Sequence, residues 1–147
     1  HKHHQKYGGN IYLQALSICA MSPSSIIIHR SVFDDVGLFD EGLPACEDYE
    51  LFLRVTNKYP VAYLDDELIV KYGGHGDQLS RAHKAMDRFR VYALDKILRS
   101  QNLSDPGKVE ATRAMLLKKA NIVHRGAQRR DNEELAVRMG EYLAHWR

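Results

Sequence analysis

Cysteine is scarce in this sequence, which has Cys19 and Cys46 in 147 residues. Two cysteines outside any Cys-x-x-Cys pair do not make a disulfide scaffold, and two reduced cysteines of a cytosolic protein are the simpler interpretation. Long apolar runs are also missing, so no segment approaches the roughly 20 residues that a membrane-spanning helix needs. A hydrophobic content of 44% with 27% charged residues excludes a disordered or collagen-like chain. What remains is a globular composition with enough length for one domain.

The sequence begins with His1 and not with methionine, and no signal-peptide pattern follows. We therefore expect a piece of a longer protein. The histidines His1, His3 and His4 could bind a metal ion, but no cysteine or carboxylate lies beside them to complete a ligand set. A solvated loop or the remnant of a tag explains them better.

The near-neutral net charge of +2 hides a split between the two halves of the chain. Residues 1–80 carry 6 basic and 11 acidic side chains, whereas residues 81–147 carry 15 basic and 8 acidic ones. This asymmetry indicates two regions with different roles. Acidic residues interleave with the basic ones in the second region, so nucleic-acid binding is not expected. A solvated helical face is favoured there, with a peripheral contact to an anionic membrane as the alternative.

The hydrophobic pattern predicts a mixed first half. We expect helices over 11–20, 32–36 and 47–59, and strands over 25–29, 61–64 and 68–72. Three consecutive β-branched residues, Ile26–Ile28, favour a strand buried on both faces. In the second half the pattern predicts three amphipathic helices. Asp105 with Pro106 is typical of a helix start, and residues 131–134 resemble a capping box.

Two adjacent carboxylates, Glu47 and Asp48, stand at the predicted start of the helix over 47–59. Acidic residues often stabilise a first helical turn, and that structural role needs no further function. A carboxylate held there beside a cleft could also accept a proton from a hydroxyl group. His75 stands between glycines in a predicted loop, where it is either solvated or able to bind a cation or phosphate.

Taken together, these segments resemble the C-terminal part of the catalytic domain of family 2 glycosyltransferases. The resemblance covers residues 11–82. It rests on the motif residues Arg30, Val32, Phe33, Val36, Gly37, Phe39, Asp40, Glu41, Glu47, Asp48, Leu51, Arg54, Tyr72, His75, Gln78 and Ser80. It implies an α/β fold of the GT-A type, partial here because the nucleotide-binding half of such a domain precedes these motifs. Residues 1–82 would form the acceptor side of the domain, and residues 83–147 a basic three-helix tail.

The resemblance also implies roles for single residues. Asp48 matches the catalytic base, and Glu47 its partner. His75 matches a position that helps to bind the metal ion on the nucleotide diphosphate. The resemblance further implies that Asp40, Glu41, Gln78 and Ser80 lie on the acceptor side. Arg54 would brace the loop or the helix. Gly37 and Phe39 could shape the acceptor side of the cleft, but a helix end for Gly37 and a core position for Phe39 are preferred.

The Asp-x-Asp metal motif of the family has no counterpart here. The acidic pairs Asp34–Asp35 and Asp65–Asp66 stand at the wrong places in the order of segments. A divalent metal ion, Mn²⁺ or Mg²⁺, would therefore be bound mainly by the preceding half, and this chain alone is expected to be inactive.

The function implied is an inverting sugar transfer from a nucleotide-sugar donor to a sugar, lipid-linked or protein acceptor, serving polysaccharide or glycoconjugate synthesis. The expected location is the bacterial cytoplasm or the inner face of its membrane. The chain could also form a homo-oligomer. The alternative is a non-catalytic interaction module with a degenerate transferase remnant.

Overall fold

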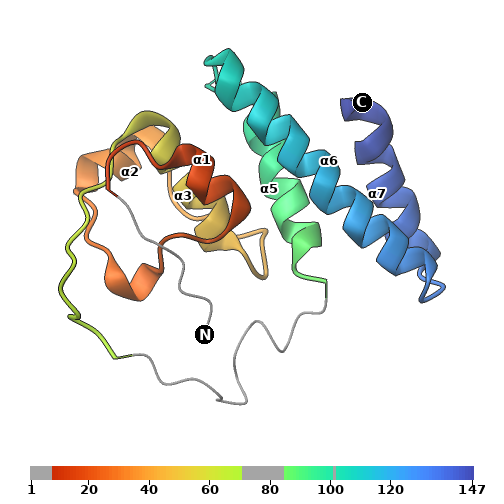
Figure 1. Cartoon of the computed structure of the whole chain (residues 1–147), viewed down its shortest axis with the longest axis horizontal. Coiled ribbons are helices and arrows are strands. Elements are labelled where there is room, and N and C mark those ends of the chain that lie inside the picture. The colour runs from red at the N-terminus through yellow and green to blue at the C-terminus, as the bar shows by residue number, and fades with distance from the viewer. Residues whose placement is uncertain (1–7, 71–84, 101) are drawn as a thin grey trace.

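The computed structural model describes residues 8–70, 85–100 and 102–147, and this part of the chain is largely helical (Figure 1). In chain order the helices are α1 (Tyr12–Ser17), the 3-10 helix η1 (Pro23–Ser25), α2 (Arg30–Val36), α3 (Glu47–Lys58), α5 (Asp87–Arg99), α6 (Pro106–Gln128) and α7 (Glu133–Trp146). In Figure 1, α1, α2 and α3 gather on one side, and α5, α6 and α7 lie side by side on the other. The helices predicted in the two halves are thereby confirmed.

Helix α2 begins and ends at residues whose chemistry explains its bounds. Gly37 follows the last turn with a φ of 83°, and its backbone N–H donates to the Phe33 carbonyl. Glycine adopts this left-handed conformation without the steric cost of a Cβ atom, as expected for a helix end. The N-cap is His29, whose Nδ1 accepts from the backbone N–H of Ser31 at 3.3 Å. Ser31 lies inside the helix, so α2 begins two residues before the predicted bounds of 32–36.

The starts of α6 and α7 follow the same rules. The Asp105 carboxylate accepts from the backbone N–H of Lys108 at 3.0 Å, and Pro106 occupies the first helical position, where its missing N–H costs nothing. In α7 the cap is Asn132, whose side chain accepts from the N–H of Leu135 at 3.1 Å.

One apolar core joins the helices of both halves. Its buried members come from α1, α3, α5, α6 and α7, and include Tyr12, Leu16, Tyr49, Leu53, Val91, Leu94, Leu116, Val123, Met139 and Leu143. At its centre Tyr12 and Thr112 are 1% and 0% exposed, and their hydroxyl groups are hydrogen-bonded at 2.8 Å. Burial of this area from water stabilises the contact between the first half and the helical tail.

The predicted strands do not form in the described residues. The sole β-type pairing there is an isolated antiparallel bridge between Gly9 and Val61. Ile27 is fully exposed, and Leu68 and Val70 are 72% and 77% exposed, so these apolar residues lack the burial that their pattern predicted. A strand needs a neighbour to receive its backbone hydrogen bonds, and β-propensity alone does not provide one. The α/β GT-A fold is therefore not confirmed by this structure.

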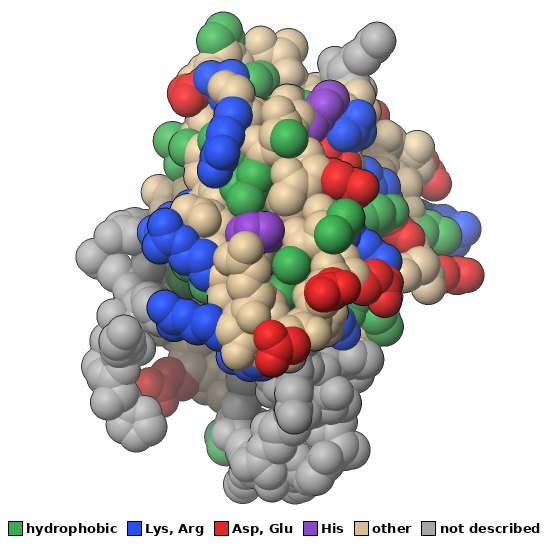
Figure 2. Space-filling model, turned by 90° about the vertical axis from the view of Figure 1, so that its right-hand side faces the viewer, with side chains coloured by type: hydrophobic (Ala, Val, Ile, Leu, Met, Phe, Trp, Pro, Cys, Tyr) green, Lys and Arg blue, Asp and Glu red, His purple; other side chains and the backbone are tan. Residues whose placement is uncertain are grey.

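The surface of the helical tail carries charges of both signs. Figure 2 views the molecule from the side on which α7 lies in Figure 1, and basic and acidic side chains both occur across that face. Among the helices described, none is both long enough and apolar enough to cross a membrane. The expected peripheral membrane contact remains a hypothesis.

Candidate active site

The first turn of α3 carries the two carboxylates that the sequence singled out. Glu47 and Asp48 occupy its first two positions, and the residue before them, Cys46, has a left-handed φ of 63°. The Cys46 carbonyl accepts from the Glu50 backbone N–H at 3.1 Å, so the strained residue leads directly into the helix. Such a conformation costs about 1–3 kcal/mol in a non-glycine residue and is often found at functional sites. The positive end of the helix dipole favours negative charge at this point.

The carboxylate of Asp48 is half-buried and held at both oxygens. Its Oδ1 accepts from the backbone N–H of Tyr49 at 2.6 Å, and its Oδ2 accepts from the Cys19 thiol at 3.2 Å. A carboxylate has about four acceptor positions, and these two contacts leave capacity for another donor. The arrangement therefore fixes the direction of Asp48 and leaves it able to receive a hydroxyl hydrogen.

Cys19 is the neighbour of Asp48 that sequence reasoning missed. Burial, and next the hydrogen bond to Asp48, raise the pKa of the Cys19 thiol to about 12, while the positive charge of Arg90 opposes the rise. The thiol therefore stays protonated near neutral pH, and its one hydrogen can be donated to Asp48 or to the Met21 carbonyl, which lies 3.1 Å from the sulfur. Nothing in the spacing of Cys19 and Asp48, which are 29 residues apart, could have indicated this contact.

Glu47 is half-buried beside Asp48, and within the described residues it makes no hydrogen bond or ion pair. Tyr49, the next residue, is buried and donates from its hydroxyl group to the Leu16 carbonyl at 2.7 Å. The guanidinium of Arg90 on α5 lies 5.9 Å from the Tyr49 ring centre, which is cation–π range. The first turn of α3 is thus supported by α1 on one side and α5 on the other.

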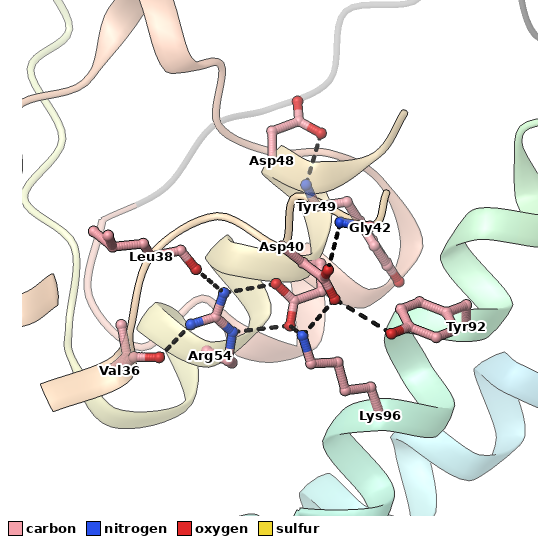
Figure 3. Close-up of polar contacts among 10 residues, drawn as sticks. Val36, Leu38, Asp40, Gly42, Asp48, Tyr49, Arg54, Tyr92 and Lys96 are labelled. Carbon is pink, nitrogen blue, oxygen red and sulfur yellow. Dashed lines mark hydrogen bonds and ion pairs between the residues drawn. The ribbon is translucent and has the colours of Figure 1, made fainter. Parts of the chain in front are cut away.

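A second polar cluster joins α2, α3 and α5 (Figure 3). Arg54 donates to the carbonyls of Val36 and Leu38 and forms an ion pair of 2.6 Å with Glu50. Glu50 is 2% exposed and also pairs with Lys96 at 3.0 Å. The expectation that Arg54 braces the neighbouring loop is confirmed. Arg54 belongs to the family motif in the sequence, and its contacts with Glu50 and the two loop carbonyls give it a structural role.

Asp40, expected on the acceptor side, belongs to this second cluster. Its Oδ2 pairs with Lys96 at 2.6 Å and accepts from Tyr92 at 3.3 Å, and its Oδ1 accepts from the Gly42 N–H at 3.0 Å. The hydrogen bond from Lys96 is the main reason that the pKa of Asp40 lies below its usual value. Figure 3 shows Asp48 apart from these contacts, at the first turn of α3. The structure therefore does not bring Asp40 and Asp48 together.

The remaining expected site residues fall into two groups. Glu41 lies exposed in the turn after Asp40. His75, Gln78 and Ser80 lie outside the described residues, so their expected roles stay predictions. Phe39 was expected in the core, but it is 42% exposed because the loop carries it outward.

The described part of the chain holds no cluster of metal-binding side chains. Over residues 8–70, 85–100 and 102–147, no three His, Cys, Asp or Glu side chains come close enough together to hold a metal ion. His75, the metal contact that the resemblance implied for this chain, lies outside these residues, so its role stays a prediction.

Comparisons with known proteins indicate the family of this chain. Residues 10–94 match the family described as glycosyltransferase like family 2. Two proteins described as uncharacterized glycosyltransferases, from Rickettsia felis and Rickettsia conorii, are each 29% identical over 72 residues. These alignments cover 49% of this chain and 12% of each relative, so the chain corresponds to a small part of their length. No solved structure matches.

The matched region contains Glu47, Asp48, Arg54 and most of α5. It covers more than half of the 147 residues. The chain therefore belongs to the glycosyltransferase family 2-like proteins.

Proposed function

We propose that this chain forms the acceptor side of an inverting glycosyltransferase, with Asp48 as the general base. The observation that supports the proposal best is the geometry of Asp48. Its carboxylate is half-buried at the start of α3 and is fixed by the Tyr49 N–H and the Cys19 thiol. A fixed base is effective because the acceptor hydroxyl must be aligned when it reacts.

In the proposed reaction Asp48 removes the proton of an acceptor hydroxyl while that oxygen bonds to the anomeric carbon of the donor sugar. The bond from this carbon to the nucleoside diphosphate breaks, and the leaving oxygen keeps the electron pair. Attack opposite to the leaving group inverts the anomeric centre. Glu47, half-buried beside Asp48, would orient the acceptor by accepting a second hydroxyl hydrogen.

The Cys19 thiol has a positioning role in this proposal. With a pKa of about 12 it remains a neutral donor at the pH where the base works, and it restricts the rotation of Asp48. Arg90 adds a positive charge on the α5 side and compensates part of the negative charge at the turn.

The nucleotide-sugar donor and a divalent metal ion, Mn²⁺ or Mg²⁺, are further parts of the proposal. A bound metal ion would stabilise the charge of the leaving diphosphate. His75 is the residue of this chain proposed to contact it. The acceptor would be a sugar, lipid-linked or protein hydroxyl, and the reaction would take place in the bacterial cytoplasm or at its membrane.

The test is Asp48→Asn in the full-length enzyme, with release of nucleoside diphosphate measured over a panel of nucleotide sugars. Loss of a general base should lower kcat by about 10²- to 10⁴-fold and leave donor binding unchanged. Glu141→Gln, on the exposed face of α7, is the matched control and should keep full turnover. Unchanged turnover in Asp48→Asn would refute the assignment. The configuration of the product, read by NMR, tests inversion separately.

A further inference from the structure

A groove lies between the loop that precedes α3 and the helices α5 and α7. Its volume is about 500 Å³, within the range of roughly 300–1,000 Å³ found for ligand pockets. Leu43 and Pro44 form one wall, and side chains from α5 and α7 form the others. Pro44 stands three residues before Glu47, so the groove shares a wall with the segment that carries the candidate base.

Three aromatic rings line this groove, Phe89 and Tyr92 from α5 and Tyr142 from α7. Tyr92 is 41% exposed, and its hydroxyl group donates to Asp40 at 3.3 Å, which holds the ring at the wall. Aromatic side chains give a flat apolar surface with a polar edge at tyrosine. The C–H face of a sugar ring is apolar and its hydroxyl groups are polar, so a saccharide matches this lining on both counts.

The groove also contains the guanidinium of Arg88, which has no anionic partner among the described residues. Within the described residues the buried Nε of Arg88 has no hydrogen-bond partner, and Arg88 forms no ion pair. Its guanidinium stacks on the Phe89 ring, 4.6 Å from the centre. The other groove arginine, Arg138, is already paired with Glu134 at 2.9 Å. A carboxylate or phosphate in the groove can pair with the guanidinium of Arg88 through two parallel hydrogen bonds.

We propose that this groove binds a saccharide that carries an anionic group, with Arg88 holding the carboxylate or phosphate and the three aromatic rings packing against the sugar. The aromatic rings match the apolar face of the saccharide, and Arg88, which forms no ion pair with a described residue, matches its negative charge. The identification of this saccharide as the acceptor of sugar transfer rests on the proposed function. Binding of the saccharide to the groove is independent of the proposed function.

Binding can be measured by NMR titration of the 147-residue chain. The probes are tetragalacturonate, which carries carboxylates, and maltose 1-phosphate, which carries a phosphate. Maltotetraose is the neutral control and inorganic phosphate the control without sugar. An acidic saccharide should shift the amide signals around Arg88, Tyr92 and Tyr142, and the tighter of the two probes identifies the anion. Failure of both probes to bind at millimolar concentration would overturn the proposal, as would equal binding of maltotetraose or of inorganic phosphate.

Variants locate the binding within the groove. Arg88→Gln should weaken binding of the acidic saccharide about tenfold or more, and Tyr142→Leu should weaken it several-fold while keeping an apolar side chain. Arg113→Gln on α6 is the matched control, because Arg113 pairs with Glu110 outside the groove. Unchanged affinity in Arg88→Gln would overturn the proposal. Asp48→Asn should bind the saccharide normally, so a failure of the groove and a failure of the catalytic assignment give different results.

Discussion

The thiol of Cys19 donates a hydrogen bond to Oδ2 of Asp48 across 3.2 Å, and this contact joins the segment after α1 to the first turn of α3. It links a half-buried neutral donor to the carboxylate proposed as the base. The contact also makes Cys19 a reporter of the state of Asp48, because the thiolate is the reactive form of cysteine.

Alkylation of Cys19 should be slow in the native protein and faster in Asp48→Asn. With a pKa of about 12, about one thiol in a thousand is ionised at pH 9. The hydrogen bond to Asp48 and its charge both raise this pKa, so their removal lowers it and increases the thiolate fraction. The rate with iodoacetamide, followed by peptide mass spectrometry, should rise several-fold at pH 9.

The matched control for this experiment is Glu47→Gln. It removes a charge from the same helical turn, but Glu47 is not among the main causes of the raised pKa of Cys19. Equal acceleration in Glu47→Gln and Asp48→Asn would indicate general opening of the turn, and no acceleration in Asp48→Asn would argue against the hydrogen bond.

Asp40→Asn should destabilise the fold at neutral pH, and this destabilisation should decrease at acidic pH. The pKa of Asp40 is lower in the folded chain than its unfolded value of about 3.9, chiefly because of Lys96. The carboxylate therefore stabilises the fold above about pH 4, and this contribution is lost as the pH falls through the folded pKa. We expect a loss of about 1 kcal/mol at pH 7, since Lys96 is partly exposed to solvent.

Urea unfolding at pH 7 and at pH 3 measures this effect. The difference in free energy of unfolding between the native chain and Asp40→Asn should shrink at the lower pH. Glu141→Gln should change stability by less than about 0.5 kcal/mol at both pH values. A difference for Asp40→Asn that stays constant with pH would show that the Lys96 ion pair is not its cause.

Arg54→Lys should cost about 2–3 kcal/mol in the free energy of unfolding, despite the retained charge. Lysine cannot reproduce the forked contacts to the Glu50 carboxylate and to the two carbonyls of the neighbouring loop, and Glu50 is 2% exposed. Lys58→Gln, which breaks the exposed ion pair with Asp35, should cost less than about 1 kcal/mol. Chemical denaturation ranks the two variants, and an equal cost would contradict the structural role of Arg54.

The helices of this chain could be predicted from sequence because their signals are local. Gly37 ends α2, and Asp105 with Pro106 begins α6, through contacts within a few residues. The predicted strands failed because their stability depends on partners elsewhere, and Ile27 stays fully exposed without one. For a β-rich segment, sequence shows the tendency and packing decides the outcome.

The same distinction holds at the candidate site. Glu47 and Asp48 were found because they are adjacent and begin a helix. Cys19 and Lys96 were not found, since they reach Asp48 and Asp40 across 29 and 56 residues. The motif residues Asp40 and Arg54 turned out to have ion-pair partners in the fold. Spacing identifies which residues belong to a motif, but their roles follow from contacts that only the fold shows.

Two glycines should respond to alanine in opposite ways. Gly37→Ala should destabilise by about 1 kcal/mol, because φ is 83° and the new Cβ atom would lie 3.4 Å from Nη1 of Arg54. Gly140 lies inside α7, and a Cβ atom there would meet the His124 ring at 3.8 Å, an ordinary contact. Gly140→Ala should therefore stabilise by about 0.5–1 kcal/mol through helix propensity. Thermal and urea unfolding of both variants test the pair. A stabilising Gly37→Ala would contradict the left-handed end of α2, whereas a destabilising Gly140→Ala would contradict the packing of α7 on α6.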